Sequence, residues 1–422
     1  MYEKTQLDNG LTVASHRMPS RVSVSLGVWM KAGSRYEPKD INGISHFLEH
    51  LLFKGTAKRS CEEIKQAVEG IGGSLNGFTS EELTCYLARV PGKYLAPALD
   101  VLSDMALNAC LRTEDIELER KVILEEIRMY KDLPSHFVQD LLDGLLWPDQ
   151  PLGRNIAGED ETVSGINREQ LVTYKQKFYH PKNILVVACG NLRHQALIEK
   201  AKNFFATSSR ATTNGFVPAC EKQQRVQLKI KVKDIEQTHL ALGVHSLPRT
   251  DPQRFALGLL HIILGANMSS RLFREVRETR GLAYAISTSL KFLQDTGAFM
   301  VHAGIDNKRL PEALEIILEQ LRLIKKELIA PDELGRAKEY YIGQLILALE
   351  DTSNHMLWLG ENYISLNEFL EPKEIIRQVQ KIEAEELREL AKRILQTSKL
   401  NLALIGPIKD KDNNKIKQRL SF

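Results

Sequence analysis

Residues 23–29 read SVSLGVW, and residues 238–244 in the second half of the chain read THLALGV. Both runs have the length and apolar content of buried strands. A second pair follows in the same order, NILVVACG at residues 183–190 and KLNLALIG at residues 399–406. The repeated order indicates a duplication. We therefore predict an α+β fold of two homologous domains, each a mainly antiparallel sheet packed with helices.

The boundary between the two copies is predicted at residues 207–222, where TSSRATTNGFVPACEK interrupts the periodic sequence with small, polar and turn-forming residues. This gives domains at 1–206 and 223–422, joined by a linker. In the first domain we expect a hairpin turning at residues 8–10, strands near 22–31, 74–79, 84–90 and 183–190, helices near 42–53 and 60–70, and interrupted helical periodicity over 95–146. In the second we expect strands near 226–232, 239–244, 284–290, 297–303 and 399–405, and helices near 252–264, 270–279 and 311–366.

Composition excludes several classes of function. The 57 basic and 54 acidic residues nearly balance, and no basic block interleaved with aromatic residues predicts a nucleic-acid surface. No run approaches the roughly 18 apolar residues that a membrane helix needs, and the start of the chain does not resemble a secretory signal. The five cysteines lack regular spacing, which favours reduced thiols. A cytoplasmic protein without nucleic-acid or membrane partners is expected.

Residues 43–56, GISHFLEHLLFKGT, contain a candidate metal-binding helix. Residues at positions i, i+3 and i+4 share one helical face, so His46, Glu49 and His50 are expected to project together. Two imidazoles one turn apart can bind the same zinc ion, and the Glu between them can activate a water molecule. This HxxEH arrangement reverses the commoner HExxH and is typical of zinc peptidases. The alternative interpretation is a polar patch with a chance pattern.

A catalytic zinc normally takes three protein ligands, and the carboxylate-rich segment at residues 113–131, TEDIELERKVILEEIRMYK, is the best source of the third. Helical spacing places Glu119 and Glu126 on one stripe with Val122, Ile123 and Tyr130. Glu125 is expected to face solvent. A charged surface helix would explain most of these acids, but it explains less well why Glu119 and Glu126 share a stripe with apolar residues.

These stretches resemble the pitrilysin/insulinase superfamily of zinc peptidases, in particular the short two-domain branch related to the mitochondrial processing peptidase. The resemblance covers nearly the whole chain. Its segments, in order, are GISHFLEHLLFKGT, GGSLNGFTSEELTCY, ERKVILEEI, PLGRNIAGEDETV, YHPKNILVVACGNL and MSSRLFREVRETRGLAYAIS. The resemblance implies a zinc endopeptidase with one Zn²⁺ per chain that hydrolyses oligopeptides or extended segments.

The resemblance also implies roles for individual residues. The family's third zinc ligand is a Glu 76 residues beyond the motif, which is Glu126 here, and Glu119 matches the carboxylate that supports a metal-bound histidine. Arg277 and Tyr284 match an Arg/Tyr pair that binds substrate and polarises the scissile carbonyl. Asn76 matches a strand-edge residue beside which an extended substrate adds as a further strand.

The same resemblance implies a partner. Relatives of this length pair two chains around a chamber, so we expect a homodimer in which Arg277 and Tyr284 of one subunit act with the zinc site of the other. A heterodimer is the alternative, and a non-catalytic partner subunit is the main competing function. A small-molecule hydrolase or isomerase is a third hypothesis. The intact His46, Glu49, His50 and Glu126 favour the peptidase.

Overall fold

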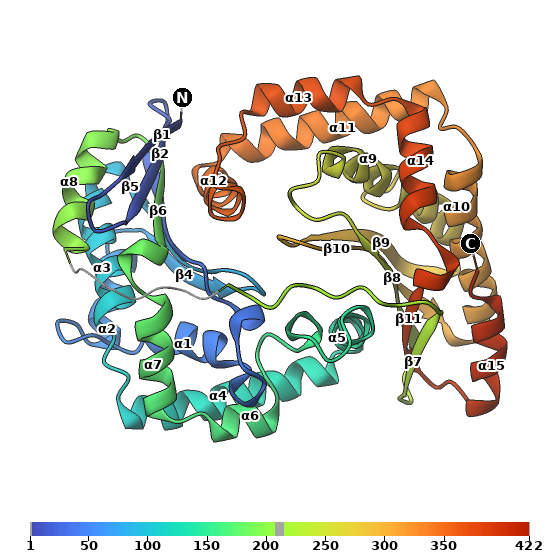
Figure 1. The fold of residues 1–422 in the computed structure, drawn as a ribbon, viewed down its shortest axis with the longest axis horizontal. Coiled ribbons are helices and arrows are strands. Elements are labelled where there is room, and N and C mark those ends of the chain that lie inside the picture. The colour runs from blue at the N-terminus through green and yellow to red at the C-terminus, as the bar shows by residue number, and fades with distance from the viewer. Residues whose placement is uncertain (1, 207–214, 422) are drawn as a thin grey trace. The chain divides into compact units, whose positions relative to one another are not determined.

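The computed structural model describes residues 2–206 and 215–421. Within these ranges the chain forms two compact units, each built on one sheet (Figure 1). The first unit comprises Met1–Arg128, Arg154–Val217 and Leu347–Leu370, and the second comprises Met129–Gly153, Pro218–Ile346 and Glu371–Phe422. Of the predicted linker, residues 207–214 lie outside the described residues, and residues 215–222 contain neither helix nor strand.

The first sheet has six strands in the order β1-β2-β6-β3-β5-β4. All neighbouring strands are antiparallel except β2 and β6, which are parallel. The strands are β1 (Tyr2–Gln6), β2 (Thr12–Arg17), β3 (Ser23–Met30), β4 (Ser74–Thr79), β5 (Thr84–Pro91) and β6 (Ile184–Gly190). Strand β4 therefore forms one edge of this sheet.

The second sheet has five strands in the order β7-β11-β8-β10-β9, and only β7 and β11 are parallel. The strands are β7 (Gln227–Val232), β8 (Gln237–Ser246), β9 (Ala283–Phe292), β10 (Gly297–Asp306) and β11 (Asn401–Gly406). Its order β11-β8-β10-β9 repeats β6-β3-β5-β4 of the first sheet. The predicted duplication and the mainly antiparallel α+β fold are confirmed, and each predicted strand is present within a few residues at its ends.

Successive side chains of β3 point to opposite faces of the first sheet. Both faces are apolar, so helices cover both of them. Val24, Leu26 and Val28 belong to the larger core, whereas Trp29 belongs to the smaller one. The larger core is formed with α1 (Ile44–Leu52), α2 (Cys61–Glu69), α3 (Leu95–Asn108), α4 (Thr113–Asp132), α6 (Asp160–Gly165), α7 (Arg168–Phe178) and α8 (His194–Phe204). The smaller core is formed with α12 (Thr352–Leu366).

The second unit combines its sheet with helices from three parts of the chain. These are α5 (Pro134–Leu146), α9 (Arg254–Leu264), α10 (Leu310–Lys326), α11 (Pro331–Glu350), α13 (Pro372–Lys381), α14 (Ala384–Ile394) and α15 (Asp410–Arg419). The helix expected at 270–279 contains a π-helical stretch, Phe273–Glu278, and the expected helical region 311–366 is divided into α10, α11 and α12. No helix in the described part of the chain is both long and apolar enough to cross a membrane.

Two helices pack in a different unit from the one that the predicted domain boundaries assign to them. Helix α5 precedes the linker but packs on β8 and β11, where Val138, Leu142 and Leu146 join the core of the second unit. Helix α12 follows the linker but packs on β3 and β6 of the first unit. The compact units therefore differ from domains 1–206 and 223–422. An amphipathic pattern shows that a helix buries a face, but it does not show which sheet covers that face.

Gly360 allows α12 to approach Trp29 closely. A Cβ atom at residue 360 would lie 2.4 Å from Cε2 of Trp29, whose side chain is fully buried. We expect Gly360→Ala to lower the free energy of unfolding by about 1–3 kcal/mol, because the crowded ring has no space to move into. Gly343→Ala on α11 is the matched control, since a Cβ there meets nothing within 4 Å. Denaturant unfolding of the full chain measures both, and equal stability of the two variants would contradict the packing argument.

Candidate metal and peptidase site

Helix α1 presents the HxxEH residues on one face because its apolar residues occupy the other. Ile44, Phe47, Leu48, Leu51 and Leu52 are buried in the core of the first unit. His46, Glu49 and His50 remain on the less buried face.

A buried acid holds the beginning of α1. The carboxylate of Glu37 accepts hydrogen bonds from the backbone N–H groups of Gly43 and Ser45 at 2.7 and 2.8 Å, and from the side chain of Asn42 at 2.9 Å. A negative charge is favourable at this end of a helix dipole. Burial raises the pKa of Glu37, while these donors act in the opposite direction. Glu37 thereby anchors the helix that carries the two histidines.

His46, His50 and Glu126 converge on one point. Oε2 of Glu126 lies 3.8 Å from Nε2 of His46 and 3.5 Å from Nε2 of His50. One ligand atom from each residue lies within 4.8 Å of the others, and no other such group of His, Cys, Asp or Glu occurs in the described residues. Tetrahedral zinc with bonds of about 2.0–2.1 Å separates its ligand atoms by about 3.3 Å. The observed distances are close to this value, so the donor set fits a zinc ion.

Glu119 fixes the orientation of the His50 ring. Its Oε2 lies 2.9 Å from Nδ1 of His50, and its Oε1 forms an ion pair with Lys54. The ring N–H at Nδ1 donates to the carboxylate, so Nε2, which faces Glu126 at 3.5 Å, is the nitrogen available to a metal once it has lost its proton. Glu119 is nearly fully buried, as expected for a residue that supports a ligand and does not itself bind the metal.

We expect Glu119→Gln to weaken zinc affinity by about 10–100-fold, because the charge that polarises His50 is lost while the three ligand atoms remain. Competition with a chromophoric chelator measures the dissociation constant. Glu117→Gln is the matched control, since Glu117 lies on the same helix, is exposed and pairs with Arg120. Unchanged zinc affinity in Glu119→Gln would remove this supporting role.

Strand β4 holds Glu49 beside the group formed by His46, His50 and Glu126. Oε2 of Glu49 accepts a hydrogen bond of 2.7 Å from Oγ1 of Thr79, and a Cβ at Gly77 would lie 3.3 Å from Cγ of Glu49. The absence of a side chain at Gly77 thus lets the strand pass close to the helix. Burial raises the pKa of Glu49 above its usual range. A carboxylate whose pKa is nearer to neutrality is a better general base.

The pKa values of the two histidines are shifted in opposite directions. Burial, with a smaller contribution from His50, lowers the pKa of His46 to about 4. Burial also acts to lower the pKa of His50, but hydrogen bonds to Glu119 and Glu126 outweigh it and raise the pKa to about 9. The pKa of Glu126 is lowered, chiefly by its hydrogen bond to His50. Without a metal, the site therefore holds a cation between two carboxylates, which is the charge balance that a bound cation would supply.

The predicted stripe on α4 is correct except for Val122. Glu119 and Ile123 are buried, Glu126 is half-buried, and the Glu125 side chain is 71% exposed and pairs with Arg128. Val122 is 45% exposed, contrary to the prediction. At about 100° per residue it lies roughly 60° from the centre of the stripe, at the edge that faces solvent.

Asn76 lies on β4, the edge strand of the first sheet, with an exposed side chain whose Oδ1 accepts a hydrogen bond from the N–H of Gly77 at 2.8 Å. An edge strand has unpaired backbone groups that can pair with an extended peptide. The same strand contributes Thr79 to the Glu49 carboxylate.

Arg277 and Tyr284 come together in the second unit. Arg277 lies in the π-helical stretch and Tyr284 near the start of β9, and the guanidinium lies 5.6 Å from the centre of the Tyr284 ring and 4.8 Å from that of Phe273. Tyr284 is 75% exposed. Single turns of π-helix are frequent at functional sites, and an exposed Arg/Tyr pair offers hydrogen-bond donors to a ligand.

Three contributors to the site were not predicted. Thr79 orients Glu49, Lys54 pairs with Glu119, and Glu37 anchors α1. Lys54 is four residues beyond His50, so helical spacing could have suggested it. Thr79 acts from a strand thirty residues away from Glu49, and Glu37 acts from the loop before α1; no periodic pattern marks either residue.

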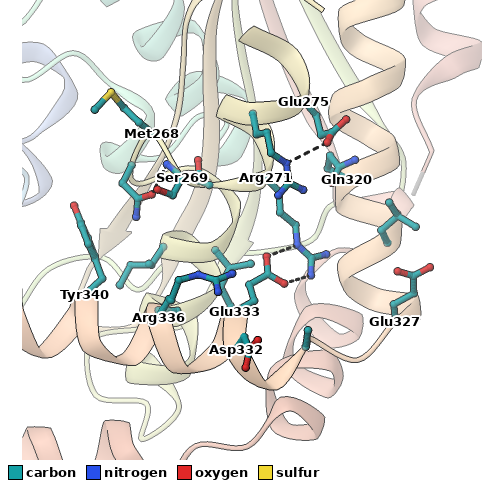
Figure 2. A pocket seen from close by; sticks show the side chains of 18 residues that line it. Met268, Ser269, Arg271, Glu275, Gln320, Glu327, Asp332, Glu333, Arg336 and Tyr340 are labelled. Carbon is teal, nitrogen blue, oxygen red and sulfur yellow. Dashed lines mark hydrogen bonds and ion pairs between the residues drawn. The ribbon is translucent and has the colours of Figure 1, made fainter. Parts of the chain in front are cut away.

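A cavity in the second unit is separate from these residues. It has a volume of about 900 Å³ and lies among Ser270, Arg271, Glu333 and Arg336 (Figure 2). Arg271 donates two hydrogen bonds to Glu333, at 2.8 and 2.6 Å, across its floor. None of His46, Glu49, His50, Glu126, Arg277 or Tyr284 lines it, so this cavity is not part of the candidate site.

Known proteins share both the sequence and the fold. The family profile described as Insulinase (Peptidase family M16) matches residues 12–160, and that described as Peptidase M16 inactive domain matches residues 165–341. An uncharacterized zinc protease of Streptomyces coelicolor is 35% identical, with 98% of this chain and 91% of the relative covered. The uncharacterized zinc protease YmxG of Bacillus subtilis is also 35% identical, with 96% and 98% covered. The crystal structure of a protease from Helicobacter pylori superposes with a TM-score of 0.90 at 24% identity, covering 96% of this chain and 99% of that one.

Proposed function

Because this chain belongs to the insulinase family of peptidases, peptidase family M16, we propose that it is a zinc-dependent endopeptidase of the HxxEH type. Its substrates are oligopeptides or extended segments. The zinc proteases among its relatives match it along almost their whole length, which supports an assignment that rests on both units.

The convergence of His46, His50 and Glu126 beside Glu49 carries the proposal. Two imidazole nitrogens and one carboxylate oxygen match the ligand set of catalytic zinc sites, which keep one position open. When bound, zinc supplies a Lewis acid that makes water a nucleophile near neutral pH. One ion per chain is expected, because the described residues contain one such cluster.

Glu49 is the general base in this mechanism. Its carboxylate accepts the proton of the attacking water and then delivers it to the leaving amine. Thr79 holds one carboxylate oxygen at 2.7 Å, which restricts the rotation of the side chain. Glu119 keeps the His50 ring in its binding orientation.

Arg277 and Tyr284 bind the substrate and stabilise the negative charge that develops on the carbonyl oxygen. A guanidinium and a phenol both donate hydrogen bonds of the kind that an oxyanion needs. The backbone of an extended substrate pairs with β4 beside Asn76, so peptides are bound with little dependence on most of their side chains.

The active form is a homodimer in which the Arg277 and Tyr284 of one subunit complete the zinc site of the other. A two-fold arrangement gives two equivalent sites. Because this chain carries both the ligand set and the Arg/Tyr pair, two identical copies suffice, and a heterodimer with a second chain is not required.

The function is tested with purified protein. Metal analysis should find zinc, and quenched fluorescent peptides should be cleaved, with cleavage lost in a chelator and restored by added zinc. Zinc-loaded protein that cleaves no member of a diverse peptide library would contradict the peptidase assignment.

The shared site is tested by mixing two inactive variants, Glu49→Gln and Arg277→Ala. In a mixed dimer one site combines the intact zinc cluster of the Arg277→Ala chain with the intact Arg277 of the Glu49→Gln chain. Activity should therefore return after subunit exchange. A mixed dimer that forms but stays inactive would show that each chain uses its own Arg277.

A further inference from the structure

A small pocket of about 230 Å³ in the second unit has Tyr284 as one of its walls, and we call it the Tyr284 pocket. Its other lining residues come from α5 and from strands β8, β9 and β10. They are Ser135, Val138, Gln139, Gln237, His239, Leu240, Ala285, Ser287, His302, Ala303 and Gly304. The volume is below the roughly 300–1,000 Å³ of sites for drug-sized ligands and suits a single side chain.

The register of the sheet explains why the pocket exists. Gly304 pairs with His239 and with Ala285, and His302 pairs with Ser287. Directly paired residues project to the same face, so these groups share one face of the sheet. Helix α5 packs on that face over β8 and β11 and leaves β9, the edge strand, uncovered. The pocket is the space between the helix and this edge.

Several polar groups in the pocket have unused hydrogen-bonding capacity. Nε2 of His302 lies 2.8 Å from Oγ of Ser289, but its Nδ1 is buried and has no partner among the described residues. Within the described residues the side chains of Gln237 and His239 are not hydrogen-bonded either, and both are half-buried. A buried polar atom without a partner is unfavourable, so a ligand that hydrogen-bonds to Nδ1 of His302 is favoured.

The pocket has a largely apolar lining with a few polar groups, and it is uncharged. No Lys, Arg, Asp or Glu is among the described residues that line it. Burial lowers the pKa of His302 to about 4 and also lowers that of His239, so both rings are neutral at pH 7. A charged substrate side chain would lose its hydration here without gaining a counter-ion, which is strongly unfavourable.

We propose that the Tyr284 pocket is a specificity subsite that receives one uncharged, hydrogen-bonding side chain of the peptide, such as that of Gln, from a residue next to the bond held by Tyr284. The inference rests on the proposed function, because it takes Tyr284 as a residue that touches the substrate. His302, His239 and Gln237 then determine which peptides are cleaved.

Profiling of cleaved peptides tests the subsite. Mass spectrometry of a peptide library should reveal one position near the cleaved bond that selects Gln over the similarly shaped Met by about 10-fold, and that disfavours Lys and Glu. His302→Phe keeps a ring and removes both nitrogen atoms, so the ratio of kcat/KM for Gln and Met peptides should fall toward 1. Gly304→Ala narrows the pocket without backbone conflict, since its Cβ would lie 3.1 Å from the movable Oε1 of Gln237 and 3.9 Å from Cε1 of His239. It should reduce the preference for Gln over Gly.

The outcomes separate the two proposals. Gly343→Ala, remote from the pocket, is the control and should keep the wild-type profile, and thermal melting identifies any variant that fails to fold. If His302→Phe does not fold, Gly304→Ala decides alone. A wild-type enzyme that cleaves peptides but prefers a charged residue at that position, or folded variants with the wild-type profile, would overturn the subsite and leave the peptidase intact. Zinc-loaded wild-type protein without any cleavage would overturn both.

Discussion

Replacing Glu49 with Gln is expected to reduce peptide hydrolysis by about 10²–10⁴-fold, the usual contribution of a general base. The amide has nearly the same shape as the carboxylate but cannot accept the proton of the attacking water. Because Glu49 is not among the residues whose ligand atoms converge, the variant should keep its zinc. Steady-state kinetics with a quenched peptide and metal analysis of the same sample measure the two properties.

The combination of lost turnover and retained metal distinguishes a base from a ligand. Glu69→Gln on α2 is the matched control. Glu69 is exposed, and its replacement removes the same charge from another helix of the first unit. Turnover at the wild-type rate in Glu49→Gln would refute the mechanism. Loss of zinc together with activity would instead mean that Glu49 binds the metal.

Replacing Glu126 with Gln is expected to weaken zinc affinity by more than about 100-fold, beyond the 10–100-fold typical of residues that only support a ligand. In the proposed site Glu126 is the one anionic ligand, and its Oε2 lies 3.8 Å from Nε2 of His46 and 3.5 Å from Nε2 of His50. An amide oxygen is a weaker donor and leaves the cation less neutralised. Peptide hydrolysis should be lost in parallel and should return only at high zinc concentration.

The neighbouring Glu125 offers a close control. Glu125→Gln changes the same residue type one position away, but that side chain is exposed and pairs with Arg128. Zinc content after dialysis against a weak chelator should be normal in Glu125→Gln and low in Glu126→Gln. Full zinc occupancy in Glu126→Ala would refute the ligand assignment.

The parts of the molecule that depend on local periodicity could be predicted from sequence. His46 and His50 lie one turn apart on α1, and the i, i+7 spacing of Glu119 and Glu126 puts both on the side of α4 that faces them. Helical geometry fixes such relations over one or two turns. The presence of two similar sheets followed from the repeated order of apolar runs.

Relations across the fold could not be predicted in this way. The apolar face of α5 could pack on any sheet with an exposed apolar face. Its sequence pattern therefore does not determine that it packs on β8 and β11, which depends on the complete second unit. Thr79 reaches Glu49 because Gly77 lets β4 approach α1, a contact between segments thirty residues apart. Val122 was misplaced because an edge position of a stripe is buried or exposed according to the width of the neighbouring element.

The position of α12 has a consequence for biosynthesis. During translation from the N-terminus, the first sheet is complete once residue 190 has emerged, but its Trp29 face stays open until residues 352–366 follow. At about 5–20 residues per second this interval lasts roughly ten to thirty seconds. The nascent chain therefore carries an exposed apolar sheet surface through somewhat less than half of its synthesis, and an exposed apolar surface of this kind favours aggregation.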